Sequence, residues 1–234
     1  MIIAGLQKLS LIDYPGHICC IVFTQGCNFN CPFCHNPEQI KPMKEADVDE
    51  SFITVESFFD FLESRKGKLE AVCITGGEPT LHRDLPDFIH RISTMGFKIK
   101  LDSNGYNPDK LKNLLDSGCV DYVAMDIKST PEHYPRLMGR TIDIERIKRS
   151  VEIIRNSGID YEFRTTCVPG LHEYEDFESI ADWIGPSRAY YLQEFRPDIT
   201  NDPTITDITV NHELDLTRIR DSLQGRFQIL QIRT

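Results

Sequence analysis

The chain has 234 residues, the length of one typical domain or of one domain with an appendage. Lys and Arg total 26 and Asp and Glu total 36, so the formal charge of −10 argues against a general nucleic-acid-binding protein. Hydrophobic residues make up 40%, which excludes a disordered chain, and the longest apolar run, residues 18–23, is far shorter than the ~20 residues of a membrane helix. The first residues do not resemble a signal peptide, so we expect a cytoplasmic protein that binds neither nucleic acid nor a membrane.

Six short apolar runs predict the strands of a parallel sheet. Each run has the length of a strand and shows little polar alternation, which is typical of strands buried on both faces. The runs are residues 18–24, 71–75, 97–101, 122–127, 161–168 and 190–195.

Helices are predicted between these strands because apolar residues there repeat with a helical period. Glycines such as Gly96 and Gly118 follow the apolar stripes and are expected to end the helices. The predicted helices cover residues 58–62, 85–95, 107–117, 144–157 and 174–184.

Repeated strand–helix units require right-handed parallel crossovers, which leaves a doubly wound sheet or a full or partial barrel. About 180 residues carry six units, too few for a closed barrel of eight, and no G-x-G-x-x-G motif follows the first strand. We therefore predict an α/β fold, a partial (β/α)6 barrel in residues 18–200. An N-terminal hairpin in 1–17 and a C-terminal helix and edge strand in 201–234 are predicted to belong to the same domain.

Three of the eight cysteines lie close together after the first predicted strand. Cys27, Cys31 and Cys34 have the spacing C-x3-C-x2-C, which indicates metal ligands or redox groups in a chain without a signal peptide. Ordinary core cysteines are disfavoured by the polar flanking residues. Zinc with His35 as fourth ligand is disfavoured because His35 is adjacent to Cys34. An iron–sulfur cluster with three cysteine ligands would keep one iron open for a substrate or cofactor. The default expectation for the other cysteines is buried apolar residues: Cys19, Cys20, Cys73, Cys119 and Cys167.

Further motifs end the other predicted strands. Thr75-Gly76-Gly77-Glu78-Pro79 ends the second, and its glycines would let a ligand approach the backbone, although this sequence alone is also typical of a turn. Asp102-Ser103-Asn104-Gly105 ends the third strand and Met125-Asp126-Ile127-Lys128 the fourth. Arg164 lies in the fifth strand, and Glu194-Phe195 end the sixth. Because (β/α) barrels carry their active sites at this end of their strands, the alignment of the motifs predicts a functional site.

These motifs together resemble those of a known family. The cysteine motif with Phe33 before Cys34 resembles the signature of the radical S-adenosylmethionine (SAM) superfamily, and Gly76-Gly77-Glu78 resembles its GGE motif. The series of strand-end motifs is similar to that of the glycyl-radical-enzyme activating enzymes. Residues 5–16 and 31–38 look most like the branch called anaerobic ribonucleoside-triphosphate reductase activating proteins. The resemblance covers residues 1 to about 200 and is weak in the C-terminal stretch.

The resemblance implies a partial barrel of the radical SAM type, in which Cys27, Cys31 and Cys34 hold a [4Fe–4S] cluster whose open iron is chelated by SAM. It implies a monovalent cation near Asp102 and Asp126, although both aspartates are also typical caps of loops. The residues implied to bind the cofactor are Phe33, His35, Gly76, Gly77, Glu78, Ser103, Asn104, Asp126, Lys128, Arg164 and Phe195. Without that context, Lys128 and Arg164 are equally typical of surface charges and His35 of a loop residue.

The implied activity is the generation of a radical on another protein. An electron donor such as flavodoxin or ferredoxin reduces the cluster, SAM is cleaved, and the 5′-deoxyadenosyl radical takes hydrogen from a glycine Cα. No catalytic acid–base pair is expected, since the cofactor carries the chemistry. The expected partner is a glycyl radical enzyme, an anaerobic ribonucleotide reductase.

Two alternatives stay open: an activase of another glycyl radical enzyme, or a small-molecule radical SAM enzyme such as a deazapurine synthase. Apart from residues 25–51 and 129–143, the predicted βα loops are short. A small-molecule enzyme usually closes longer loops over its substrate, so the short loops favour a protein substrate whose peptide enters the barrel mouth.

Overall fold

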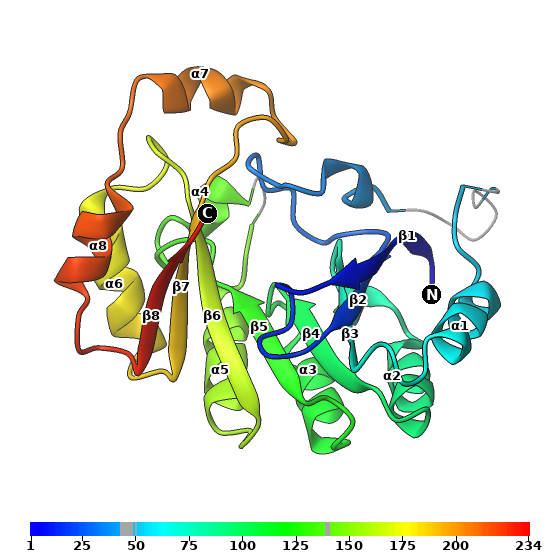
Figure 1. Cartoon of the computed structure of the whole chain (residues 1–234). Coiled ribbons are helices and arrows are strands. Elements are labelled where there is room, and N and C mark those ends of the chain that lie inside the picture. The colour runs from blue at the N-terminus through cyan, green and yellow to red at the C-terminus, as the bar shows by residue number, and fades with distance from the viewer. Residues whose placement is uncertain (43–48, 50, 139–140) are drawn as a thin grey trace. The chain divides into compact units, whose positions relative to one another are not determined.

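The computed structural model describes residues 1–42, 49, 51–138 and 141–234. Its eight strands follow one another through the sheet in chain order, from β1 to β8 (Figure 1). The pairs β2–β3, β3–β4, β6–β7 and β7–β8 are parallel, and β1–β2 is antiparallel. The predicted α/β fold with a mostly parallel, open sheet is therefore confirmed. Parts of the loops 25–51 and 129–143 lie outside the described residues.

The chain folds into two compact units, which we describe separately. Unit 1 comprises residues 1–28, 38–103 and 109–123, and unit 2 comprises residues 29–37, 104–108 and 124–234. The boundary divides the cysteine loop, because Cys27 belongs to unit 1 and Cys31 and Cys34 belong to unit 2. The expectation of one domain, with boundaries at residues 17 and 200, stays a prediction.

Unit 1 contains the first four strands and the helices that follow them. The strands are β1 Ile3–Ser10, β2 Cys19–Thr24, β3 Ala71–Gly76 and β4 Lys98–Ser103. The α-helices are α1 Val55–Ser64, α2 Leu85–Thr94 and α3 Pro108–Asp116. Two short 3-10 helices are η1 Pro37–Gln39 and η3 Pro79–Leu81. The first residues of η1 and of α3 belong to unit 2. Phe58 and Phe59 of α1 pack against Phe88 of α2 with ring centroids 5.2 and 5.3 Å apart. The apolar stripes predicted from the sequence therefore meet in the core of unit 1.

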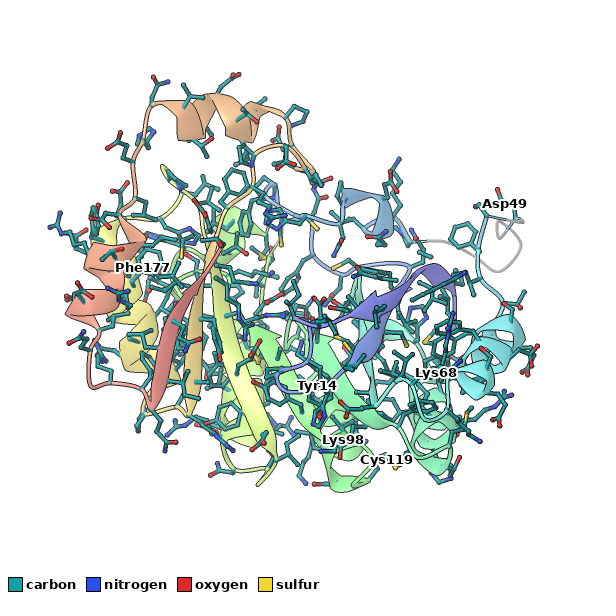
Figure 2. The ribbon with its side chains drawn as sticks, in the orientation of Figure 1. Tyr14, Asp49, Lys68, Lys98, Cys119 and Phe177 are labelled. Atoms are coloured by element: carbon teal, nitrogen blue, oxygen red, sulfur yellow. The ribbon has the colours of Figure 1, made fainter. Side chains whose placement is uncertain are left out.

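The N-terminal hairpin uses the first core strand as its second arm. β1 pairs with β2, with Gln7 opposite Ile21, whereas the sequence placed the whole hairpin within residues 1–17. The connection is fixed by Ser10, whose Oγ accepts hydrogen bonds from the backbone N–H groups of Ile12 at 3.2 Å and Asp13 at 3.3 Å. Tyr14 (labelled in Figure 2) is buried in the core of the unit. The turn after β1 is therefore ordered by one serine and anchored by one aromatic ring.

Unit 2 contains the last strands and most of the C-terminal helices. Its strands are β6 Asp160–Cys167, β7 Ala189–Glu194 and β8 Ile229–Arg233, while β5 Tyr122–Asp126 has residues in both units. Its helices are α4 Tyr134–Leu137, α5 Ile144–Arg155, α6 Tyr174–Ile184, α7 Thr204–Val210 and α8 Leu216–Ser222. The strands β6, β7 and β8 lie side by side, and α8 packs against β7 and β8 (Figure 1). The predicted C-terminal helix and edge strand correspond to α8 and β8, whereas the sequence did not predict α4 and α7.

Side chains alternate between the two faces of β6, as in any strand. Tyr161 and Phe163 share one face, where their rings lie 5.3 Å apart. Glu162 and Arg164 share the other face, and the register of β7 places Tyr191 beside Arg164. One face of β6 is therefore aromatic and the other carries charge. Among the described residues, no helix is long and apolar enough to cross a membrane.

Candidate functional site

The three clustered cysteines have local partners in the structure. In unit 1 the Sγ of Cys27 lies 3.9 Å from Oδ1 of Asn28. In unit 2 the Sγ of Cys31 lies 3.4 Å from Sδ of Met138, and the Sγ of Cys34 accepts the backbone N–H of Asn36 at 3.4 Å. In the part of the chain that the structure describes, no three His, Cys, Asp or Glu side chains are grouped as ligands of one metal ion. The role of the cysteines as cluster ligands therefore stays a prediction.

Backbone hydrogen bonds hold the cysteine loop from the C-terminal side of unit 2. The carbonyl oxygen of Pro32 accepts the N–H groups of Asn201 at 3.1 Å and Asp202 at 3.0 Å. The side-chain Nδ2 of Asn201 donates to Oδ1 of Asn30 at 3.0 Å and to the carbonyl oxygen of Cys31 at 3.3 Å. We call this set of bonds the Asn201 clamp. The sequence alone does not predict this clamp, because Asn201 lies in a loop with no sequence motif.

A cluster of charged side chains lies on β5 and β6 in unit 2. Oδ2 of Asp126 accepts Nζ of Lys128 at 2.9 Å, and Oδ1 accepts Nε of Arg164 at 2.9 Å. Burial alone would raise the pKa of Asp126, but the two cations hold it well below its usual range. The structure therefore brings together three of the residues that the sequence predicted. We call them the Asp126 cluster.

The positive charge of Lys128 also acts on two of the cysteine thiols. Burial opposes the charged form of Lys128, but Asp126 together with Cys31 and Cys34 raises its pKa above the usual range. Burial raises the pKa of Cys34, against the opposing effects of the Asn36 N–H and of Lys128. Thiolates are the form in which cysteine binds metal, so a nearby lysine and an N–H donor to sulfur fit an iron–sulfur site.

An aromatic pair lies next to the cysteine loop in unit 2. The rings of His35 and Phe195 are stacked, with centroids 5.9 Å apart and planes 18° apart. Nε2 of His35 accepts the backbone N–H of Arg196 at 3.3 Å, so the other ring nitrogen carries the proton of the neutral form. Burial lowers the pKa of His35, and the charges of Lys128 and Arg196 lower it further. His35 is therefore neutral at pH 7, and its ring lies nearly parallel to that of Phe195.

The exit of the chain from β5 is fixed by two buried side chains that the sequence analysis missed. Nδ1 of His172 accepts the N–H of Val168 at 3.1 Å, so its Nε2 donates to the carbonyl oxygen of Lys128 at 2.9 Å. The hydroxyl of Tyr134 accepts the N–H of Lys128 at 2.9 Å and donates to the carbonyl oxygen of Asp126 at 3.4 Å. Both backbone polar groups of Lys128 are therefore held, which orients its side chain.

His172 also packs against aromatic rings. Its ring centroid lies 6.3 Å from that of Phe33, the aromatic residue of the cysteine motif, and 5.8 Å from that of Phe177. Phe177 comes from α6 and is labelled in Figure 2. His172 is 1% exposed, and burial lowers its pKa. His172 thus connects the cysteine loop, the β5 exit and α6 within unit 2.

The Gly76–Gly77 pair packs against backbone in unit 1. A Cβ at Gly76, whose φ is +112°, would lie 2.6 Å from the carbonyl oxygen of Thr24. A Cβ at Gly77 would overlap the carbonyl oxygen of Gly26 and lie 2.8 Å from that of Gln39. The predicted role of these glycines, to let a ligand approach the backbone, stays a prediction, and the structure adds a packing constraint of its own. The backbone of Gly77 lies against Gly26, the residue that precedes Cys27, and that of Gly76 lies against Thr24.

Glu78 and Ser103 are brought together in unit 1. Oε1 of Glu78 accepts the hydroxyl of Ser103 at 2.9 Å and the N–H of Thr80 at 3.1 Å, and its own N–H donates to the carbonyl oxygen of Gly26 at 2.8 Å. Glu78 is buried. The Gly-Gly-Glu segment is thus fixed to both β4 and the start of the cysteine loop.

Asp102 forms an ion pair with Lys100 of the same strand. Nζ of Lys100 also lies 3.7 Å from Sγ of Cys73, and Lys100 is only 2% exposed. Asp102 and Asp126 are thus each paired with cations that the protein itself supplies. The monovalent cation near these aspartates stays a prediction.

Asn104 forms a turn at the start of its segment in unit 2. Its Oδ1 accepts the backbone N–H of Tyr106 at 3.0 Å, as in an Asx turn. The following Gly105 has a φ of +73°, and a Cβ there would overlap the side chain of Met125. Its carbonyl oxygen accepts the hydroxyl of Ser150 at 2.6 Å. The predicted role of Asn104 in binding the cofactor stays a prediction.

Comparisons with known proteins agree on the family. The model of the Radical SAM superfamily matches residues 21–184. A Methanocaldococcus jannaschii protein named as a glycyl-radical enzyme activating enzyme is 31% identical, over 100% of this chain and 96% of the relative. The pyruvate formate-lyase-activating enzyme of Clostridium pasteurianum is 26% identical, over 83% of this chain and 81% of the relative.

A solved structure supports the fold. The crystal structure of Streptococcus suis SuiB bound to S-adenosylmethionine superposes with a TM-score of 0.66 at 14% identity, covering 90% of this chain and 49% of that chain. The family implies a [4Fe–4S] cluster and SAM as cofactors. A family model that spans most of the chain and a relative that spans all of it lead to one conclusion: the chain belongs to the radical SAM superfamily.

Proposed function

We propose that this protein is an activase that cleaves SAM at a [4Fe–4S] cluster and generates a glycyl radical on an anaerobic ribonucleotide reductase. The observation that carries the proposal is the position of Lys128. Its ammonium pairs with Asp126 at 2.9 Å and acts on the thiols of Cys31 and Cys34. A cationic cluster beside two predicted cluster ligands suits a cofactor that carries a carboxylate.

Each residue has a proposed task at this site. Cys27, Cys31 and Cys34 would hold the cluster, and Lys128 would favour the thiolate forms of Cys31 and Cys34. When bound and supplied with one electron by the donor protein, the cluster and SAM would supply the radical chemistry that removes a hydrogen atom from a glycine Cα.

The other unit 2 residues would bind SAM through charge and stacking. Arg164 and Lys128 would attract its carboxylate, because together with Asp126 they leave one positive charge in excess. His35 and Phe195 would offer their stacked rings to the adenine base. Phe33 and Asn104 would shape the same pocket.

The unit 1 residues would act through the shape of their loop. Gly76, Gly77 and Glu78 would hold the segment beside Cys27, and Ser103 would fix Glu78. A monovalent cation near Asp102 and Asp126 is a separate hypothesis, which predicts that SAM affinity changes when potassium replaces sodium in the buffer.

The choice of an anaerobic ribonucleotide reductase rests on the likeness of residues 5–16 and 31–38 to that branch of activating proteins. A second candidate is pyruvate formate-lyase, because relatives that carry the name of its activating enzyme are 26% and 30% identical to this chain. In both cases a flavodoxin or a ferredoxin is the proposed electron donor.

The test is anaerobic incubation of the reconstituted, reduced protein with SAM and each candidate enzyme, followed by electron paramagnetic resonance. We expect a glycine-centred doublet with an anaerobic ribonucleotide reductase and none with the Cys31→Ala variant. A doublet only with pyruvate formate-lyase would transfer the proposal to the second candidate. Turnover of a small purine-like substrate without any doublet would refute an activase.

A further inference from the structure

The Asp126 cluster continues along the charged face of β6. The backbone N–H of Ile127 donates to the carbonyl oxygen of Arg164 at 2.7 Å, which holds the end of β5 beside β6. Glu162 precedes Arg164 by two residues and lies on the same face of the strand. Nη1 of Arg164 lies 4.0 Å from Oε1 of Glu162. Arg164 is therefore placed between two carboxylates, those of Asp126 and Glu162.

Glu162 is held by an arginine from the C-terminal strand. Nη1 and Nη2 of Arg233 donate to the two carboxylate oxygens of Glu162 at 2.6 and 2.7 Å. The guanidinium of Arg233 lies 3.4 Å from the ring centroid of Tyr191, on the strand between them. The side chain of Glu162 is 0% exposed and that of Arg233 is 31% exposed. This is a bidentate ion pair supported by a cation–π contact.

The strand that supplies Arg233 lies outside the family match. The Radical SAM model ends at residue 184, and β8 covers Ile229–Arg233 (Figure 1). Charges of alternating sign thus run through unit 2 from Lys128 to Asp126, Arg164, Glu162 and Arg233.

We propose that Arg233 is a positioning residue, which keeps Arg164 on Asp126 by binding both oxygens of Glu162. A buried carboxylate needs a positive partner, and Arg233 meets that need with a two-point contact. Arg164 then keeps its 2.9 Å contact with Asp126 rather than closing the 4.0 Å gap to Glu162. The part of this inference that concerns SAM rests on the proposed function.

Loss of Arg233 should change which of the two carboxylates, Asp126 or Glu162, Arg164 contacts. In Arg233→Ala the buried charge of Glu162 draws Arg164 away from Asp126. Removing that charge as well, in Arg233→Ala/Glu162→Gln, takes away the attraction and returns Arg164 to Asp126. A merely structural role for Arg233 predicts that only the thermal unfolding midpoint falls in the single variant and recovers in the double variant, while the SAM affinity of the folded protein stays unchanged.

The experiment measures the SAM dissociation constant by equilibrium dialysis with anaerobically reconstituted protein, alongside iron content and the thermal unfolding midpoint. We expect Arg233→Ala to weaken SAM binding about tenfold and the double variant to recover to within about threefold of the parent protein. Arg233→Lys keeps the charge but loses the two-point contact, so its affinity should fall between the two. The matched control is Arg226→Ala, which removes another C-terminal arginine, one paired with Asp182 at the surface. It should change affinity less than twofold.

Unchanged SAM affinity in a folded, iron-loaded Arg233→Ala variant would overturn the inference, as would a double variant weaker than the single one. Parent protein that binds iron but no SAM would instead refute the proposed function. The two failures are therefore distinguishable. If Arg233→Ala does not fold, the comparison of Arg233→Lys with Arg233→Lys/Glu162→Gln tests the same recovery.

Discussion

Each unit contains an aspartate, a lysine and a cysteine in proximity, but the two groups differ in their surroundings. In unit 1 Lys100 pairs with Asp102 and lies 3.7 Å from the thiol of Cys73, all on neighbouring core strands. In unit 2 Lys128 pairs with Asp126 and acts on thiols in a loop, and Arg164 adds a second cation. The comparison teaches that the same residue types can form two groups with different surroundings and different net charge. The unit 2 group combines loop thiols with an excess of positive charge, whereas the ion pair of unit 1 is balanced.

The largest expected effect is the loss of the cluster, which should follow substitution of a cysteine in the unit 2 group but not in the unit 1 group. Cys31→Ala should abolish the visible absorbance of the cluster and all SAM cleavage, because three ligands are the minimum for the proposed site. Cys73→Ala should keep both, since Cys73 is buried beside Lys100 in the strands of unit 1. Iron content after anaerobic reconstitution gives the answer. Equal loss of iron in both variants would break the comparison.

Substitutions of the two aspartates should affect different properties of the protein. Asp126→Asn should weaken SAM binding by about ten- to a hundredfold, about 1.4–2.8 kcal/mol, because Arg164 and Lys128 lose the carboxylate that orients them. Asp102→Asn should instead lower the free energy of unfolding by about 3–5 kcal/mol, because it removes one member of the buried ion pair between Asp102 and Lys100.

Urea unfolding and equilibrium dialysis of SAM measure these two effects. The double variant Lys100→Met/Asp102→Asn should regain most of the stability, since it also removes the buried charge. If Asp102→Asn weakens SAM binding as strongly as Asp126→Asn, the group of unit 1 is not merely structural. The hypothesis of a monovalent cation at both aspartates would then be favoured.

A side chain at Gly77 should have a smaller effect. Gly77→Ala should lower stability by about 1–3 kcal/mol and reduce iron loading, because its Cβ meets the backbone of Gly26, next to Cys27. Gly5→Ala is the matched control, because Gly5, like Gly77, has no positive φ and its Cβ would meet Phe23 only at an ordinary contact distance of 3.5 Å. Normal iron loading combined with lost SAM affinity in Gly77→Ala would favour the ligand-approach explanation over backbone packing.

The smallest expected effect is on the pH dependence of stability, and it concerns the buried His172 of unit 2. Burial lowers the pKa of His172 in the folded protein, so the unfolded chain binds its proton more readily. The stability due to the neutral ring is complete above the unfolded pKa of about 6.5 and is lost as the pH falls below it, by at most about 1.4 kcal/mol per pH unit. His172→Asn should flatten the decline of the unfolding midpoint between pH 6.5 and 5. An unchanged slope would show that other groups, such as His35 and His82, whose pKa values are also lowered, dominate the decline.

The sequence predicted the sheet well, because buried parallel strands are apolar throughout and their helices carry periodic stripes. It also located Asp126, Lys128 and Arg164, since parallel strands bring their ends to one edge. It did not predict that these three residues would bond to one another, because distances between strands are not visible in a sequence.

Contacts between residues that are far apart in the chain could not be predicted from the sequence. Glu162 and Arg233 are 71 positions apart, and no pattern in the sequence around either residue indicates that they pair. His172 acts through the backbone of a residue 44 positions away. The Gly-Gly-Glu motif is visible in the sequence. Its contacts with Gly26 and Gln39 are not, because they depend on how distant parts of the chain pack together.

The Asn201 clamp has a consequence for the order in which this protein matures. During synthesis Cys27, Cys31 and Cys34 leave the ribosome long before Asn201 and Asp202, whose N–H groups hold the carbonyl oxygen of Pro32. A nascent chain thus displays its three thiols before the hydrogen bonds that secure their loop can form. Under the proposed function, iron that enters the finished fold would meet a loop already held by these hydrogen bonds, whereas iron delivered before the chain is complete would meet the loop without them.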